Sequence, residues 1–384
     1  MSEIRLPVYL DYNATTPVAP EVLAAMVPYF SERYGNPSSS HSYGRAAKQG
    51  LDQAREQLAD LLGAGPQELI FTGCATESNN LALFAMARTA PIHKRHLIIS
   101  AIEHPAIMQP ALELQRQGWE VTFAEVDQQG RIDLELFRQS LRPDTAFVSI
   151  MHANNEIGTI QPIHEIAKLT RGLGITLHVD AAQSVGKIRV DVKELGVDML
   201  SVAGHKFYAP KGVGALYVRK GAQAPPLTYG ASHERGMRPG TENVASIVGL
   251  GAAAHLANQR LQSTGPTLMK LRDRLHSLLA SAVPGLSLNG HPSERLPNTL
   301  NVSFPGTDAD QLLRATEQDV AASLGSACHS GARVASDVLV AIKATQDQAA
   351  GAVRFSLGEP TTEAEIGHAA QAIIAGRRAL KRNQ

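Results

Sequence analysis

A lysine and an aspartate stand at the ends of two apolar segments in the middle of the chain. Lys206 closes the segment Gly204-His205-Lys206, and Asp180 closes an earlier segment, His178-Val179-Asp180. A lysine amine can form a Schiff base with an aldehyde, and an acid beside a pyridine nitrogen keeps that nitrogen protonated, so that the ring withdraws electrons. The pair predicts chemistry on pyridoxal 5'-phosphate (PLP), held by a covalent Schiff base on Lys206.

A turn earlier in the chain has the composition of a phosphate site. The segment Thr72-Gly73-Cys74-Ala75-Thr76-Glu77 joins a predicted strand to a predicted helix. Free backbone N–H groups at a helix N-terminus, together with the Thr76 hydroxyl, suit a phosphate. An ordinary capping turn is the other interpretation. The glycines are not spaced as in a Walker loop or a dinucleotide-binding fingerprint, so neither of those sites is indicated.

Two further polar residues follow predicted strands. The imidazole of His104 can stack on a flat pyridine ring and can carry protons, although a lone histidine among 14 is also compatible with a solvent-facing loop. Asn155 follows a strand that ends at Met151. Its amide can bond the ring's 3-oxygen or a substrate carboxylate, and a simple Asn-rich turn is the structural alternative.

A cysteine and an arginine near the C-terminus have the types needed for sulfur and carboxylate chemistry. Cys328 lies among serine and glycine residues with no apolar periodicity, which indicates a loop. A thiol there can be a nucleophile if a neighbouring imidazole lowers its pKa. Free cysteines are more often buried small hydrophobes, and that is the interpretation for Cys74. Arg354 can clamp a carboxylate through two hydrogen bonds or form a structural salt bridge.

The elements that must position these residues alternate along the first two thirds of the chain. Short β-rich segments separated by helical patterns occur at residues 69–72, 97–100, 121–123, 147–151, 176–179, 199–202 and 214–218. This alternation predicts an α/β fold with a mostly parallel sheet and helices on both faces. Several polar motifs follow these strands directly, where open α/β sheets bind ligands.

The last third of the chain has a different pattern. A long helical region begins near residue 246, and two strand-like segments, 300–304 and 353–357, precede a closing helix. This pattern predicts a smaller α+β domain. We assign residues 14–255 to a large PLP-binding domain, and residues 1–13 and 256–384 to a small domain that carries the Cys328 loop.

Composition excludes several classes of function. The 384 residues contain 36 Lys plus Arg and 36 Asp plus Glu, so nothing in the charge indicates a nucleic-acid or membrane-surface partner. No apolar run reaches the roughly 18 residues of a membrane span, and the N-terminus does not resemble a signal peptide. Two cysteines are too few for a disulfide framework or a thiolate metal site. We expect a soluble cytoplasmic protein without a metal.

The ordered motifs resemble the PLP-dependent cysteine desulfurases of the NifS and IscS type, within the aspartate-aminotransferase fold (fold type I). The resemblance extends over nearly the whole chain. The segments that carry it are 9–17, 35–39, 75–80, 154–156, 178–183, 204–206, 234–243, 326–328 and 354–358. It implies a large domain built on a mostly parallel seven-stranded sheet, plus a smaller α+β domain.

The resemblance also implies how the ring of PLP is held. Lys206 would carry the Schiff base, Asp180 would bond the pyridine nitrogen, and His104 would stack on the ring. Gln183 and Asn155 would touch the ring oxygen or the substrate.

The phosphate would be held, by the same resemblance, by the Ala75 backbone, Thr76 and His205. Thr241 would reach in from a second subunit, which implies a homodimer with shared active sites. Ala203 stands at a cofactor-binding position where many relatives have a hydroxyl residue, so one phosphate hydrogen bond must be lost or supplied elsewhere.

For the reaction, the resemblance implies that Arg354, Asn155 and Asn13 bind the carboxylate end of L-cysteine. Cys328 would attack the sulfur of the bound cysteine, which releases alanine and leaves an enzyme persulfide. The persulfide would pass to an acceptor protein of iron–sulfur cluster assembly or other sulfur trafficking, whose identity the sequence does not give. A selenocysteine lyase is the alternative, because several of the same motifs resemble that branch too.

Overall fold

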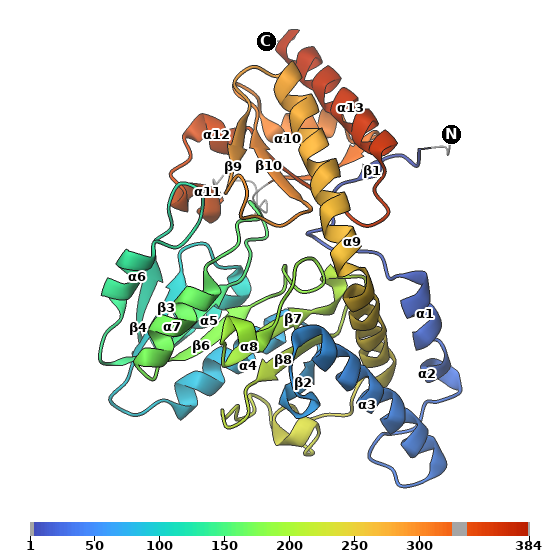
Figure 1. Ribbon diagram of the computed structural model, residues 1–384, viewed down its shortest axis with the longest axis vertical. Coiled ribbons are helices and arrows are strands. Elements are labelled where there is room, and N and C mark those ends of the chain that lie inside the picture. Colours follow the sequence, from blue (N-terminus) through green and yellow to red (C-terminus); the bar gives the residue numbers. More distant parts are fainter. Residues whose placement is uncertain (1–3, 325–335, 383–384) are drawn as a thin grey trace.

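The computed structural model describes residues 4–324 and 336–382, and Figure 1 shows their arrangement in a larger lower part and a smaller upper part. The lower part is built on a seven-stranded sheet with the order β2-β8-β7-β6-β5-β3-β4. Its strands are β2 (Leu69–Thr72), β3 (His96–Ser100), β4 (Glu120–Ala124), β5 (Thr145–Met151), β6 (Thr176–Asp180), β7 (Met199–Ala203) and β8 (Gly214–Val218).

Only β8 runs against its neighbours in this sheet. It pairs antiparallel with β2 and β7, whereas β3, β4, β5, β6 and β7 form parallel pairs. All residues of β3, β5, β7 and β8 are buried, which is typical of parallel sheets covered on both faces. The predicted α/β fold with a mostly parallel seven-stranded sheet is confirmed.

Helices cover both faces of the sheet. They and the other helices of the described chain are α1 (Pro20–Met26), α2 (Pro28–Ser31), α3 (Ser42–Leu62), α4 (Ala75–Thr89), α5 (Pro105–Arg116), α6 (Leu134–Ser140), α7 (Ile163–Gly172), α8 (Val192–Leu195), α9 (Val244–Ala282), α10 (Ala309–Ala315), α11 (Asp337–Ala341), α12 (Gln346–Ala350) and α13 (Glu363–Arg382).

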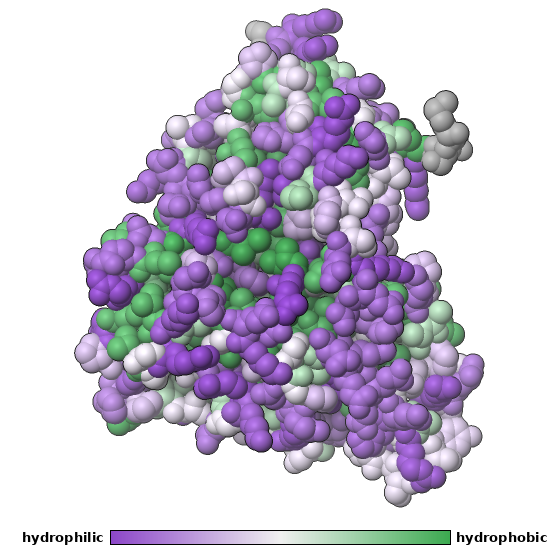
Figure 2. All heavy atoms as spheres, viewed as in Figure 1, coloured by the Kyte–Doolittle hydropathy of each residue, from purple (hydrophilic) through white to green (hydrophobic). Residues whose placement is uncertain are grey.

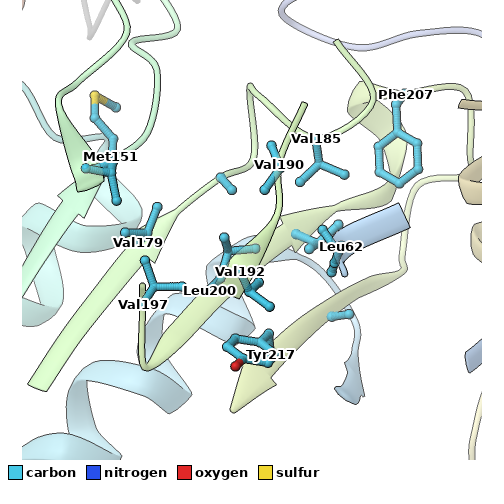
Figure 3. Close-up of a cluster of buried hydrophobic side chains, with 14 of the residues drawn as sticks. Leu62, Met151, Val179, Val185, Val190, Val192, Val197, Leu200, Phe207 and Tyr217 are labelled. Atoms are coloured by element: carbon cyan, nitrogen blue, oxygen red, sulfur yellow. The ribbon is translucent and has the colours of Figure 1, made fainter. Parts of the chain in front are cut away.

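The alternation of side chains along each strand divides the core into two layers. Ile70 of β2 packs with residues of α4 and α5 on one face, while its neighbours Leu69 and Phe71 pack with α3 and α9 on the other. Figure 3 shows part of the second layer, where Leu62 of α3 lies near Leu200 of β7. Burial on both faces therefore fixes the register of the strands that end at the site.

A buried histidine links the three central strands. The ring nitrogens of His178 in β6 lie 2.8 Å from the hydroxyl of Ser149 in β5 and 2.9 Å from the hydroxyl of Ser201 in β7. Burial lowers the pKa of His178 to about 3, so the ring is neutral. Because Asp180 follows two residues later on the same strand, these bonds also help to hold its position.

The upper part contains two further sheets. A four-stranded sheet has the order β12-β13-β10-β9, and a two-stranded sheet pairs β1 with β11. The strands are β1 (Val8–Tyr9), β9 (Ser287–Asn289), β10 (Thr299–Ser303), β11 (Val320–Ala321), β12 (Ser323–Leu324) and β13 (Ala352–Ser356). The smaller α+β unit expected from the sequence is confirmed.

The helix α9 joins the two parts and contributes to both cores. Its first half, with Ile247 and Leu250, belongs to the core of the large sheet, and its second half, with Leu271 and Leu275, belongs to the core of the upper part. Figure 1 shows this helix running from one part to the other. These two cores support our proposal that residues 14–255 form one domain and residues 1–13 and 256–384 the other.

On the face drawn in Figure 2, hydrophilic residues cover most of the surface, and hydrophobic residues gather between the upper and lower parts. Within residues 4–324 and 336–382, no helix combines the length and apolar character that crossing a membrane requires.

A glycine at the start of β8 lets the sheet approach the first turn of α4. A Cβ on Gly214 would lie 2.7 Å from the carbonyl oxygen of Val202 and 2.8 Å from the backbone carbon of Cys74. We expect Gly214→Ala to lower the free energy of unfolding by about 1–3 kcal/mol, because backbone must move to admit the methyl group. Gly172→Ala is the control, since its Cβ would meet nothing within 4 Å. Equal urea midpoints for both variants would contradict this account.

Candidate active site

A cavity of about 340 Å³ lies where β5, β6 and β7 end and α4 and α5 begin. Of the predicted site residues within the described chain, all but Thr241 line it. The lining residues are Asn13, Ala14, Cys74, Ala75, Thr76, Asn79, His104, Ala106, Met151, Ala153, Asn155, Asp180, Ala182, Gln183, Ala203, His205, Lys206 and Arg354. The cavity gathers residues from seven separate segments, five of which follow strands of the large sheet, as expected for the carboxyl ends of parallel strands.

Asp180 is the buried acid of this cavity. Its carboxylate accepts hydrogen bonds from the Asn79 side chain at 2.7 Å and from the backbone N–H of Ala182 at 2.9 Å. These two donors fix the orientation of the carboxylate. The arrangement fits an acid that faces a cationic nitrogen.

Lys206 ends a short 3₁₀ helix, Gly204–Lys206, that directly follows β7. Its Nζ donates to the backbone carbonyls of Asn13 at 2.5 Å and Ala14 at 2.9 Å. Burial, together with the nearby charge of Arg354, lowers the pKa of Lys206 to about 8. A lysine with this pKa is partly neutral near neutral pH. The neutral amine is the form that attacks an aldehyde.

The N-terminus of α4 opens on the same cavity. No side chain of the described residues caps this helix, whose N-cap residue is Cys74. The first backbone N–H groups of a helix have no partner within it, and the Ala75 and Thr76 amides are such groups here. Together with the Thr76 side chain they are donors that suit an anion, and the role of this turn in binding a phosphate stays a prediction.

Two histidines border the cavity, and both are neutral. The Nδ1 atom of His104 accepts from the backbone N–H of Ala106 at 3.0 Å, so His104 is the N-cap of α5. Burial lowers the pKa of His104. Burial and the charge of Lys206 also lower the pKa of His205, to about 4, and its Nδ1 lies 3.1 Å from the Thr15 hydroxyl.

Arg354 forms the salt bridge that the sequence left open as an alternative to a carboxylate clamp. One of its terminal nitrogens donates to Asp11 at 2.7 Å, and the other donates to the backbone carbonyl of Asn155 at 3.1 Å. Its Nε is buried and has no partner among the described residues. Arg354 lines the cavity, so the role in substrate binding stays a prediction.

Cys74 was interpreted as a buried packing residue, which is wrong: it is only partly buried and lines the cavity, because the helix cap brings it there. Thr241 is exposed and is not among the lining residues, so its role across a subunit interface stays a prediction. Cys328 lies outside the described residues, and its role as the nucleophile stays a prediction.

Sequence reasoning missed three residues that hold the site together. Asn79 binds Asp180, Asp11 pairs with Arg354, and Lys187 binds the side chains of Asn13 and Gln183. The spacing of Gln183 and Lys187, four residues apart, could have indicated that pair. Nothing local in the sequence connects Asp11 with Arg354.

The donor set fits PLP. A pyridine nitrogen needs an acid, an aldehyde needs an amine, and a phosphate needs N–H donors, and one cavity offers all three. Among the described residues, no group of three or more His, Cys, Asp or Glu side chains could hold a metal.

Comparison with known proteins agrees with this donor set. The family model for aminotransferase class V matches residues 8–368. A cysteine desulfurase IscS of Dictyoglomus turgidum is 44% identical over 95% of this chain and 93% of its own, and cysteine desulfurase 2 of Trichormus variabilis is 47% identical over 94% and 90%. The chain belongs to the cysteine desulfurases of the class-V aminotransferase family. Membership of this family implies a PLP-dependent enzyme.

Solved structures agree with the family. A NifS-like protein superposes with a TM-score of 0.90 at 38% identity, over 96% of this chain and 99% of its own. A protein described as SspA in complex with cysteine superposes with a TM-score of 0.80 at 37% identity, over 91% and 98%.

A buried acid beside the cavity should make stability depend on pH. Burial raises the pKa of Glu103 to about 8 from its ordinary value of 4.5, although Ser100 and the Met151 amide donate to it. Between pH 4.5 and 8 the unfolded chain therefore loses this proton while the folded chain keeps it, so folding weakens as pH rises. Between pH 5 and pH 8.5 the free energy of unfolding of Glu103→Gln should therefore rise by roughly 2–5 kcal/mol relative to that of the wild type.

Denaturant unfolding at several pH values measures this difference. The exposed Glu317→Gln is the matched control and should track the wild type throughout. A difference in free energy of unfolding between the wild type and Glu103→Gln that stays constant with pH would mean that Glu103 is ionised in the folded protein.

Proposed function

We propose that this protein is a cysteine desulfurase that converts L-cysteine and the Cys328 thiol into L-alanine and a Cys328 persulfide. The observation that carries the proposal is the single cavity lined by Lys206, Asp180 and the uncapped N-terminus of α4, in a chain 44–47% identical to proteins named cysteine desulfurase. The reaction balances, because one sulfur atom moves from the substrate to the thiol and the thiol's proton stays with the products.

In this proposal four residues hold the ring of PLP. Lys206 would carry it through a Schiff base, and Asp180, whose carboxylate accepts from Asn79 and Ala182, would bind its pyridine nitrogen. The ring would stack on His104 and receive a hydrogen bond from Gln183. When bound, PLP supplies an electron sink for the charge left by removal of the substrate's α-proton.

The phosphate would lie at the N-terminus of α4, bound by the amide of Ala75, by Thr76 and by His205. Ala203, which ends β7, offers no hydroxyl there. Thr241 would supply a further hydroxyl from a second subunit, so we propose a homodimer. Its exposed position in one chain is compatible with that role.

The substrate's carboxylate would meet Arg354, Asn155 and Asn13. The unpartnered Nε of Arg354 and its place in the cavity wall support this assignment. Lys206, whose pKa is near 8, would take the proton from the α-carbon of L-cysteine. The neutral imidazole of His104 lies in the wall of the same cavity and can relay a proton.

Cys328 would take the sulfur atom and pass it on. We propose that its persulfide goes to an acceptor protein of iron–sulfur cluster assembly or other sulfur trafficking, and that the enzyme works in the cytoplasm. A thiolate is the reactive form of cysteine, so the thiol needs a low pKa at the moment of attack.

Cys328→Ala tests the sulfur transfer. We expect the wild type to form alanine from L-cysteine in the presence of a reductant, and the variant to lose nearly all of this activity. PLP loading, measured by the visible absorption of the protein, should be unchanged in the variant. Ser281→Ala, at an exposed position near the end of α9, is the control and should keep its activity.

Alanine formation that survives Cys328→Ala would show that Cys328 does not accept the sulfur. Comparing the rates on L-cysteine and L-selenocysteine tests the remaining alternative. A strong preference for L-selenocysteine would identify a selenocysteine lyase instead.

Asp180→Asn tests the role of the buried acid. The change keeps the shape and removes the charge, so we expect kcat for alanine formation to fall about 10²–10³-fold, as for loss of a key electrostatic contact. The melting temperature should remain near that of the wild type. Asp60→Asn, at an exposed position of α3, is the control. Wild-type kcat in Asp180→Asn would exclude the proposed contact with the pyridine nitrogen.

A further inference from the structure

Lys187 lies behind the wall of the cavity, in the turn that follows β6. Its Nζ lies 2.9 Å from Oδ1 of Asn13 and 2.7 Å from Oε1 of Gln183. It is not among the residues that line the cavity, whereas Asn13 and Gln183 are. The direct contacts of Lys187 with the cavity wall are therefore those to these two amide side chains.

The cationic surroundings of Lys187 are unusual. No carboxylate in residues 4–324 or 336–382 pairs with it, although a buried amine normally has such a partner. Burial and the charges of Lys206 and Arg354 lower the pKa of Lys187 well below its ordinary value. Protonated or neutral, a lysine amine has hydrogens for both oxygens, so the two contacts do not depend on its charge.

These contacts decide which way the Gln183 amide faces. Oε1 of Gln183 is the atom that faces Lys187, and a protonated lysine amine, which only donates, holds that orientation. The Nε2 atom then points the other way and donates one hydrogen to the Asn13 carbonyl at 3.0 Å. Its second hydrogen has no partner among the described residues and is available to the cavity that Gln183 lines.

Asn13 does not depend on Lys187 to the same degree. Its Oδ1 also accepts from Asn298 at 3.1 Å, and its Nδ2 donates to Thr299 at 2.8 Å and to the Asn155 carbonyl at 3.1 Å. Oε1 of Gln183, in contrast, has only Lys187 as a partner within the described chain. Loss of Lys187 would therefore leave the Gln183 amide held only by its donation to the Asn13 carbonyl, whereas Asn13 keeps its other partners.

We propose that Lys187 is a positioning residue that fixes Gln183 as a hydrogen-bond donor toward an anionic oxygen in the cavity. That oxygen belongs either to the ring of PLP or to the carboxylate of L-cysteine, and the inference rests on the proposed function for this identification. A turned amide would present its own oxygen and repel such a group.

Lys187→Met tests the proposal, because it keeps the length of the side chain and removes the donor. Titration of the apoprotein with PLP tests whether the oxygen belongs to the ring, and KM for L-cysteine tests whether it belongs to the carboxylate. We expect about a tenfold weakening in at least one of them, the size of one hydrogen bond to a charged group. The exposed Lys193→Met is the control and should match the wild type in both.

A double variant separates positioning from a general loss of packing. In the Gln183→Leu background there is no amide to orient, so adding Lys187→Met should change the same constant less than twofold. Lys187→Gln can still donate to one oxygen, so its PLP affinity or its KM should lie between those of the wild type and Lys187→Met. It also replaces Lys187→Met in the comparison if that variant does not fold.

Unchanged PLP affinity and unchanged KM in Lys187→Met would overturn the proposal, as would an equal effect of the change with and without Gln183. Failure of the wild type to form alanine would instead refute the proposed function, while PLP affinity would still report on Lys187.

Discussion

The buried carboxylate of Asp180 is the charge on which the arrangement of the site depends. Burying an ion is costly unless hydrogen bonds or opposite charges compensate it, so the fold must bring donors to the end of β6. Asn79 comes from the second turn of α4, and the Ala182 amide comes from the turn after the strand. The helix that supplies Asn79 also opens its N-terminus on the cavity, so one element supplies both a partner of the acid and free amides that suit an anion.

Positive charge dominates the other side of the cavity. The charge of Arg354 contributes to the lowered pKa of both Lys206 and Lys187, and only Arg354 is paired directly with an acid, Asp11, among the described residues. Burial, together with the charge of Arg354, lowers the pKa of Lys206 to about 8, which suits the proposed role of its amine. The same positive field suits an anionic cofactor and a substrate carboxylate.

The segment around Asn13 ties the two parts of the molecule together at the site. The Asn13 amide binds Thr299 of β10, its backbone N–H binds Ser356 of β13, and its carbonyl accepts from Lys206. A short stretch near the N-terminus thus connects the small sheet with the lysine at the end of β7. Relative movement of the two parts would change contacts at Lys206 itself, so stability and activity are coupled through this segment.

The sequence alone was enough to predict the layered α/β fold, because buried strands and amphipathic helices have local periodicities. It also identified most of the cavity wall, since motifs that follow parallel strands meet at one edge of the sheet. The partners of these residues could not be predicted in that way. The pairing of Asp11 with Arg354, the contact of Asn79 with Asp180 and the place of Cys74 in the wall depend on segments brought together only by tertiary packing. Residue types and spacing determine what chemistry is available, whereas burial and neighbouring charges, which set the pKa of Lys206 and the orientation of Gln183, arise only in the folded chain.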